Sequence, residues 1–208
     1  MAAPVLVLDH PLLQHHLGQL RAVQTEPPAF RALVAILSQA LFVEATRDVR
    51  AVPAEVTTPL GTAPSCQVQE RLAFVPVLRA GLGMAEALLD FWPTASVWHL
   101  GLYRDHDTLQ PITYYNKLPP RVDADLALVL DPMLATGGSA MAAIDILKRH
   151  HVRRIKYLGL IAAPEGIRAL QKAHPDVPLY LMAIDDHLNE HGYIVPGLGD
   201  AGDRQFAT

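Results

Sequence analysis

The sequence predicts an α/β fold, with a mostly parallel twisted sheet flanked by helices. Apolar runs alternate along the chain with segments in which apolar residues have helical spacing, which is the order typical of βαβ units. The apolar runs span residues 72–78, 95–102, 126–130, 155–162 and 178–184, and the candidate helices span residues 82–91, 138–150 and 165–173. Because half of the 208 residues are apolar and no linker or repeat divides them, one domain over residues 1–208 is expected.

Before this alternation begins, the chain is expected to form one extended segment and two helices. Residues 4–8 have an extended character, and Asp9 and Pro11 have the chemistry of a helix cap and a first helical turn. The second helix is expected to begin near Pro28. The apolar residues at helical spacing are Leu12, Leu13, Leu17 and Leu20 in the first helix and Phe30, Leu33, Val34, Leu37 and Leu41 in the second.

Residues 49–68 have the pattern of a β-arm. Alternating segments surround the turn sequence at residues 59–62, Pro-Leu-Gly-Thr, so an antiparallel hairpin is expected here. This arm precedes the first apolar run of the predicted sheet.

Two later segments depart from the alternation. Residues 103–121 carry charges, prolines and a Tyr-Tyr-Asn sequence where a crossover helix would be expected, so we interpret them as a long loop that serves a site. The tail, residues 189–208, is rich in glycine and polar residues, with residues 193–196 as an extended piece. We call this tail the C-terminal hood.

Composition and charge limit the classes of protein that fit. Cys66 is the only cysteine, which excludes an internal disulfide framework and favours a reducing, cytoplasmic location. The N-terminus has no basic segment, and no apolar stretch approaches the ~18–20 residues of a membrane span, so no membrane partner is expected. The formal net charge of −4 gives no long-range attraction to a polyanion, which disfavours nucleic acid as a partner.

Residues 126–139 join an apolar run to a carboxylate and then to a Thr-Gly-Gly-Ser turn at the start of a candidate helix. Glycines let the backbone approach an anion closely, Thr136 and Ser139 offer hydroxyl donors, and the free amides of a helix N-terminus carry partial positive charge. The pattern indicates a cradle for a sugar phosphate, with Asp131 beside it to accept ribose hydroxyls or help hold a cation.

A tight turn with a hydroxyl N-cap is the plainer interpretation of the same residues. The position after a buried strand favours a ligand site, because ligands of open α/β sheets collect at the carboxyl ends of strands. Neither the lysine-containing P-loop pattern nor Gly-x-Gly-x-x-Gly is present, which weakens nucleoside triphosphate and dinucleotide alternatives.

Charged groups elsewhere could reach the same site. Arg79 follows another apolar run and precedes a glycine-permitted turn, where it could bind a second anionic group; an ordinary surface arginine is the alternative. Residues 103–105, Tyr-Arg-Asp, and Lys117 offer cationic and hydroxyl groups on the long loop. That loop could close over a ligand and exclude water, or it could be a solvated excursion.

The end of the chain contains two patterns that suggest different chemistry. Residues 196–204 place three glycines and two aspartates together, so their backbone could present amides and carbonyls to a small planar amide-bearing molecule, with a flexible turn as the alternative. Residues 187–191 spell His-x-x-Glu-His, a zinc-hydrolase pattern that requires both histidines on one helix face. Gly192 and Pro196 follow closely, so no supporting helix is expected and metal-dependent hydrolysis is disfavoured.

Six motifs run in order over most of the chain, at residues 78–84, 101–105, 114–119, 129–140, 162–167 and 192–204. Together they resemble the uracil phosphoribosyltransferase branch of the type I phosphoribosyltransferase family. The resemblance implies the type I phosphoribosyltransferase fold and a pentosyltransferase that moves the phosphoribosyl group of 5-phospho-α-D-ribose 1-diphosphate (PRPP) to uracil. The products would be UMP and diphosphate, and the step would belong to pyrimidine salvage.

Matching the motifs residue by residue implies roles for individual positions. Residues 131–139 would bind the ribose 5-phosphate and the hydroxyls of PRPP, and Arg79 and Arg104 would bind its diphosphate. The implied PRPP-binding set is Arg79, Arg104, Asp131, Pro132, Met133, Leu134, Ala135, Thr136, Gly137, Gly138, Ser139 and Asp200. The implied uracil-binding set is Ile194, Gly199, Asp200 and Ala201, and the catalytic set is Arg79, Arg104, Asp131 and Asp200.

The resemblance also implies cofactors and partners. Mg²⁺ would be held mainly through the diphosphate, with no protein ligand assigned with certainty. Uracil and PRPP would be the small-molecule partners of a homodimer or homotetramer. GTP, which activates some bacterial members of the family, is a candidate allosteric activator.

The sequence departs from the family pattern at its end, and one rival function shares the same ligand chemistry. The family commonly ends Asp-Arg-Leu-Phe-Gly-Thr, whereas this chain has Gln205 and Ala207, and alanine is expected to adopt a glycine conformation only at a cost. The arm around residues 50–68 matches only loosely, which leaves subunit contacts open. The rival is a non-enzymatic regulator that senses the same sugar diphosphate and binds RNA; the acidic net charge and lack of a basic aromatic face disfavour it.

Overall fold

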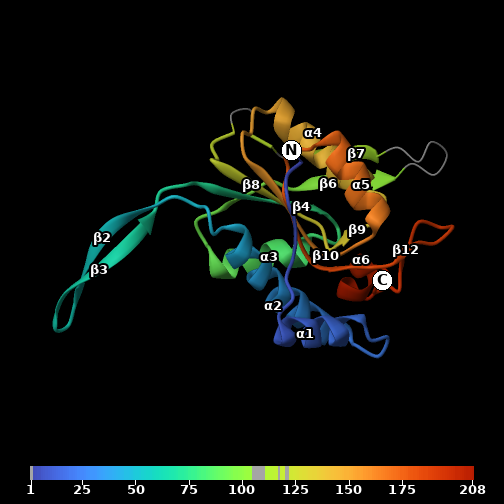
Figure 1. The fold of residues 1–208 in the computed structure, drawn as a ribbon, viewed down its shortest axis with the longest axis horizontal. Helices are drawn as coiled ribbons and strands as arrows, with labels where there is room; N and C mark the ends of the chain where they lie inside the picture. Colours follow the sequence, from blue (N-terminus) through green and yellow to red (C-terminus); the bar gives the residue numbers. More distant parts are fainter. Residues whose placement is uncertain (1, 105–110, 117, 120–121) are drawn as a thin grey trace.

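The computed structural model describes residues 2–104, 111–116, 118–119 and 122–208, and these form a twisted nine-stranded sheet between two layers of helices (Figure 1). The strands of the sheet are β1 (Val5–Val7), β4 (Leu72–Leu78), β5 (Ser96–Val97), β6 (Leu100–Arg104), β7 (Pro111–Asn116), β8 (Leu126–Leu130), β9 (Met133–Leu134), β10 (Ile155–Ala162) and β11 (Leu179–Ile184). Their order is β1–β11–β10–β8–β4–β6–β7, with β5 beside β4 and β9 beside β10. All pairs in this sheet are parallel except β6 with β7. The predicted fold class is confirmed.

The helices divide between the two faces of the sheet (Figure 1). One face carries α1 (Pro11–Arg21), α2 (Pro27–Ala45), α3 (Leu82–Phe91) and the short α6 (Ala201–Phe206), and the other carries α4 (Gly138–Arg149) and α5 (Pro164–Ala173). Alternate residues of one strand supply the two cores, since successive side chains of a strand point to opposite faces. In β4, Leu72 and Phe74 pack with the first helix group, whereas Val75 and Val77 pack with the second.

Helix α2 combines a length of 19 residues with a largely apolar sequence. It is the one helix in the described part of the chain that is long and apolar enough to cross a membrane by length and composition alone. The expectation that no apolar stretch approaches such a length is therefore wrong for α2. Its apolar character serves the protein core instead, because Phe30, Leu37 and Leu41 are completely buried against the sheet.

Most predicted elements are present, and the exceptions have local causes. The run at 95–102 is divided into β5 and β6, and residues 103–121 contain β7, which pairs with β6 and makes the loop shorter than expected. β-Branched and aromatic residues favour the β7 strand, but the charges and prolines around it made the segment resemble a loop in sequence. The first helix is capped by His10, whose Nδ1 accepts from the Leu12 amide at 3.3 Å, so the expectation of an Asp9 cap is wrong.

The predicted arm is an antiparallel hairpin of β2 (Ala51–Thr58) and β3 (Gly61–Val68) that extends away from the rest of the molecule (Figure 1). Its turn is closed by Thr58, whose Oγ1 accepts from the Gly61 amide at 3.1 Å. At its foot, Lys156 Nζ donates to the Asp48 carboxylate at 2.5 Å and to the Ala45 carbonyl at 2.6 Å. The arm is thus anchored at its base while most of its side chains remain exposed.

Candidate active site

Two parallel strands bring the predicted anion-binding residues to one edge of the sheet. β4 ends just before Arg79 and the neighbouring β8 ends just before Asp131, so both side chains lie at the carboxyl edge, where α/β sheets bind ligands. A cleft of about 290 Å³ opens there. Its lining combines Arg79, Asp131, Ser139 and Asp200 with Val77, Leu78, Ala80, Met133 and Gly202. Residues from three distant parts of the sequence therefore meet in one cleft.

The predicted phosphate cradle forms a smaller cavity of about 80 Å³ beside this cleft. Its lining consists of Asp131, Met133, Leu134, Ala135, Thr136, Gly137, Gly138, Ser139 and Ala140. Gly137 precedes α4 with a positive φ of 83°, and a Cβ there would lie 3.1 Å from the Gly166 carbonyl oxygen, so both conformation and space favour glycine. The N-terminal amides of α4 therefore open onto a concave surface suited to an anion.

One residue of the predicted cradle points elsewhere. Pro132 is buried and lines neither cavity. Its carbonyl oxygen accepts from the amides of Leu160 and Ile161 in β10, each at 3.0 Å. Pro132 thus ties the cradle to the sheet, while its neighbours face the cavity.

Asp131 has an unusual electrostatic environment. The pKa of its carboxyl is raised from 3.8 to about 7, mainly because burial disfavours the charged form; a hydrogen bond from the Met133 amide lowers this pKa, and the nearby Asp200 raises it. That amide lies 3.3 Å from Asp131 Oδ1. The side chain is partly exposed, since it lines the cleft, and a carboxyl with these properties is suited to a cation or to sugar hydroxyls.

Tyr157, in the neighbouring strand β10, bonds to the main chain of Asp131, and the sequence pattern did not predict this contact. Its hydroxyl donates to the Asp131 main-chain carbonyl at 2.9 Å, and burial together with the Asp131 charge raises the pKa of this phenol well above 10.0. Gly159 makes room for the ring, because a Cβ there would lie 2.8 Å from it. A tyrosine inside a mainly apolar run was the available signal, since buried phenols usually bond a partner.

Arg79 already has an anionic partner in the hood. Its Nη2 lies 2.8 Å from Asp203 Oδ1, and its Nη1 donates to Thr208 Oγ1 at 3.3 Å. The peptide bond between Leu78 and Arg79 is cis. Both side chains of the ion pair are about half exposed, so the pair is weak enough for a more highly charged ligand to displace Asp203.

The long-loop candidates are only partly covered by the structure. Arg104 is the last residue of β6, and its side chain lies outside the described part. Asp105 and Lys117 are themselves outside the described residues. The role predicted for Arg104 therefore stays a prediction.

The hood places only one of the four predicted uracil-binding residues in the cleft. Asp200 lines it, whereas Ile194, Gly199 and Ala201 do not. Ile194 lies in β13 (Ile194–Val195), which pairs with β12 (His187–Leu188), and both Ile194 and Ala201 are buried. Gly199 has a positive φ of 78° and is exposed, next to the cleft residue Asp200.

The hood also contains a short helix that the glycine-rich sequence did not predict. Residues 201–206 form α6, and Asp200 is its N-cap, since Oδ1 accepts from the Asp203 amide at 2.9 Å. Gln205 in α6 is completely buried and its Nε2 donates to the Ala80 carbonyl at 2.9 Å, which links the hood to the turn after Arg79. The alternative of a flexible turn alone therefore does not describe residues 201–206, because the cap at Asp200 starts a helix.

The His-x-x-Glu-His pattern has no helical support. His187 belongs to β12, while Glu190 and His191 lie in the turn toward β13, and both are strongly exposed. The two histidines therefore do not share a helix face. Across the part of the chain that the structure describes, no cluster of three histidine, cysteine or acidic side chains has the arrangement of a metal site.

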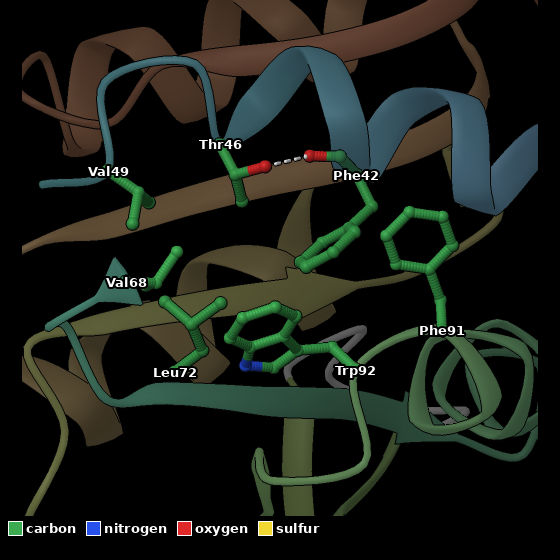
Figure 2. Close-up of a pocket in the computed structure, with 7 residues that line it drawn as sticks. All are labelled: Phe42, Thr46, Val49, Val68, Leu72, Phe91 and Trp92. Carbon is green, nitrogen blue, oxygen red and sulfur yellow. Dashed lines mark hydrogen bonds between the residues drawn. The ribbon is translucent and has the colours of Figure 1, made fainter. Parts of the chain in front are cut away.

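A separate apolar pocket of about 160 Å³ lies at the foot of the arm (Figure 2). Its lining is Phe42, Thr46, Val49, Val68, Leu72, Phe91 and Trp92, and the one hydroxyl among them, on Thr46, donates to the Phe42 carbonyl at 2.7 Å. No charged side chain lines it. It is therefore unsuited to a phosphate ester, and the polar cleft is the candidate active site.

Comparisons with known proteins identify the family of this chain. The family model described as uracil phosphoribosyltransferase matches residues 7–208. The chain is 63% identical to the uracil phosphoribosyltransferase of Roseiflexus castenholzii over 204 residues, covering 98% of each, and 55% identical to that of Symbiobacterium thermophilum over 205 residues, again covering 98% of each. The solved structure of the AQ2163 protein from Aquifex aeolicus is similar as well, with a TM-score of 0.90, 36% identity and 98% of each chain covered. The chain thus belongs to the uracil phosphoribosyltransferase family.

Proposed function

We propose that this protein is a uracil phosphoribosyltransferase, a pentosyltransferase that converts uracil and PRPP to UMP and diphosphate in pyrimidine salvage. The family match over nearly the whole chain supports this activity. The single structural observation that carries it is the meeting of Arg79, Asp131 and the cradle in one cleft. These groups have the chemistry needed to bind a sugar that bears a phosphate at one end and a diphosphate at the other.

The cradle is the proposed site of the ribose 5-phosphate. Its cavity combines the hydroxyl-bearing side chains of Thr136 and Ser139 with the amides at the start of α4. Phosphate is stabilised by backbone donors and by the positive end of the helix dipole. Asp131, which lines both cavities, is then in position to accept hydrogen bonds from the ribose hydroxyls.

The opposite side of the cleft is the proposed site of the diphosphate. Arg79 lines the cleft, and Arg104 is expected to join it from the end of β6. Phosphoribosyltransferases generally use Mg²⁺ with PRPP, and Mg²⁺ typically binds one or two carboxylates together with substrate phosphates. Asp131 and Asp200 are the described carboxylates in the cleft that could take part, and the bound cation would neutralise charge on the leaving group.

In the proposed reaction, the arginines would stabilise the negative charge of the departing diphosphate. Breaking the bond between ribose C1 and the diphosphate leaves negative charge on the departing group. A well-placed donor to such a group is often worth ~3–4 kcal/mol in the transition state, and Arg79 and Arg104 would supply this stabilisation. Holding the uracil nitrogen against C1 would provide much of the remaining acceleration through orientation.

Uracil is proposed to bind to hood backbone around Ile194 and residues 199–201. A planar base edge needs both donors and acceptors, which main-chain amides and carbonyls provide. Asp200 connects the two substrates, since it lines the donor cleft and belongs to the predicted uracil set. The described cleft holds no group that must serve as a dedicated base.

The remaining assignments concern partners and location. We infer a cytoplasmic homodimer or homotetramer, in which the projecting arm is available for subunit contacts (Figure 1). GTP activation is carried over from some bacterial members of the family as a candidate regulatory property. Sedimentation and an activity titration with GTP would test these two points separately.

The decisive experiment is UMP formation from labelled uracil, PRPP and Mg²⁺, with hypoxanthine, adenine and orotate as control bases. We expect UMP from uracil and no nucleotide from the three controls. Nucleotide formation from a control base alone would change the assigned base, and no product from any base would reject the enzyme. In that case, a salt-sensitive RNA mobility shift would revive the regulator alternative.

A further inference from the structure

A largely buried ion pair between Arg21 and Asp185 contacts the hood, and the proposed reaction assigns no role to either residue. Arg21 ends α1, and Asp185 directly follows β11 at the carboxyl edge of the sheet. Arg21 Nη1 donates to Asp185 Oδ2 at 2.7 Å, and Nη2 donates to Oδ1 at 2.5 Å. The Asp185 side chain is only 3% exposed. Such a bidentate pair has one well-defined geometry, unlike a surface ion pair.

The pair holds both polar groups of one hood residue. The Gly197 amide donates to Asp185 Oδ2 at 2.9 Å, and the Gly197 carbonyl accepts from Arg21 Nη1 at 2.7 Å. Gly197 has a positive φ of 65°, and a Cβ there would collide with the Ile194 carbonyl oxygen. The backbone at Gly197 is therefore fixed by the ion pair on both sides, in a conformation that requires glycine.

A second arginine fixes the next residue of the hood. Arg204 Nη1 donates to the Leu198 carbonyl at 2.7 Å, and Nη2 donates to the Ala22 carbonyl at 2.5 Å, next to Arg21. Its guanidinium lies over the Phe30 ring, 4.5 Å from the centroid. Consecutive hood carbonyls, at 197 and 198, are thus held by α1 and α6, immediately before the exposed Gly199 and Asp200.

We propose that Arg21 and Asp185 are a positioning pair for the nucleobase, which fixes the hood backbone between Ile194 and Ala201 so that it can read uracil. The inference rests on the proposed function for the identity of the base. The positioning itself follows from geometry: the pair bonds the segment between the predicted uracil residues, and in the described part of the chain none of these bonds involves the cradle. Loss of the pair should therefore weaken recognition of uracil more than recognition of PRPP.

Two variants test the pair from its two sides. Arg21→Lys keeps the positive charge but cannot form the bidentate fork and also reach the Gly197 carbonyl. Asp185→Asn keeps the size of the side chain and removes the charge. The matched control is Arg154→Lys, because Arg154 also pairs with a largely buried carboxylate, Glu70 Oε2 at 2.5 Å, but lies just before β10 at the amino edge of the sheet.

Two measurements are needed on each full-length variant. Steady-state kinetics should show a KM for uracil raised by roughly tenfold in Arg21→Lys and more in Asp185→Asn, with the KM for PRPP within about twofold of wild type. Hydrogen exchange should rise at the amides of residues 194–195 and 197–201 in both variants, while the amides of β4, β8 and β10 stay protected. Arg154→Lys should change neither quantity.

Failure of the positioning role and failure of the proposed function would give different results. Unchanged exchange in the hood of a folded Arg21→Lys variant would overturn the positioning role, and so would equal effects on the two KM values. If Asp185→Asn unfolds, Arg21→Lys decides the question alone. A wild-type protein that forms no UMP would reject the proposed function and the assignment of uracil to this pair, and the exchange comparison would still judge whether the pair orders the hood.

Discussion

The Tyr157 hydroxyl donates to the main-chain carbonyl of Asp131 across 2.9 Å, from the middle of β10 to the residue after β8. The Asp131 amide in turn donates to the Leu158 carbonyl at 3.2 Å. Both peptide groups that flank the Asp131 side chain are thus tied to one neighbouring strand. Because these two bonds use only main-chain groups of Asp131, they orient its carboxyl toward the cleft, where Oδ1 accepts a further bond from the Met133 amide at 3.3 Å.

We expect Tyr157→Phe to loosen Asp131 while preserving the ring. Leaving a buried acceptor without its donor typically costs about 1–3 kcal/mol of stability. A displaced Asp131 should also lower kcat/KM for PRPP by roughly tenfold. Urea denaturation and steady-state kinetics would measure the two effects. Tyr180→Phe is the control, because Tyr180 faces the opposite core and sits under the Lys156 ammonium; it should leave kcat/KM unchanged. Equal kinetic effects in both variants would contradict the orienting role.

The raised pKa of Asp131 predicts a pH dependence of stability. Since the folded pKa is about 7 and the ordinary value is 3.8, the folded state binds the proton more tightly, and this contribution to stability is lost as pH rises from about 4 through 7. Allowing for the water that reaches the cleft, the loss should be on the order of 2 kcal/mol. Asp131→Asn should remove it, so the difference in unfolding free energy between variant and wild type should grow in favour of the variant between pH 5 and pH 8. A difference that stays constant over this range would disprove the shift.

The contact between Arg79 and Asp203 predicts competition with the diphosphate. Asp203→Asn removes the carboxylate from the arginine, so diphosphate should bind more tightly, by up to about fivefold for an exposed pair. Inhibition of the reaction by added diphosphate would report this affinity. Asp176→Asn makes the same charge change at an exposed pair with Lys148, at the far end of α4, and should have no effect. Weaker diphosphate inhibition in Asp203→Asn would mean that Asp203 assists binding instead.

Arg104→Ala tests the contribution of the β6 end to catalysis. If Arg104 stabilises the departing diphosphate, its removal should lower kcat by about 100-fold, with the circular dichroism spectrum and Tm unchanged. An undiminished rate would remove this residue from the mechanism.

Ala207 carries a local strain that a single substitution should relieve. It ends α6 in the left-handed region, with φ 58° and ψ 44°, a conformation that is expected to cost free energy for alanine. Ala207→Gly should stabilise the protein by roughly 0.5–1 kcal/mol, because relief of the strain outweighs the greater freedom of glycine in the unfolded chain. Ala207→Val should shift stability in the opposite direction, since a β-branched residue tolerates positive φ poorly. Thermal unfolding of the two variants would show opposite changes in Tm.

The sequence alone was sufficient for elements and motifs that are contiguous along the chain. The bounds of β4, β8, β10 and α3 coincide with the predicted ranges, because each is a short apolar run or helical stripe with turn residues at its ends. The cradle was predictable for the same reason, since its glycines, hydroxyls and helix start lie within ten residues. Local conformation follows from local residue types when packing does not oppose it.

Only the tertiary structure decided which remote groups meet. Tyr157 reaches Asp131 because β10 lies beside β8, and Asp200 reaches the same cleft through the path of the hood, which no local pattern specifies. The Arg21–Asp185 pair likewise joins residues far apart in sequence, and a hydrogen bond between such groups depends on strand order and helix placement. Residue types alone therefore determined the chemistry available to this protein, and packing determined its geometry.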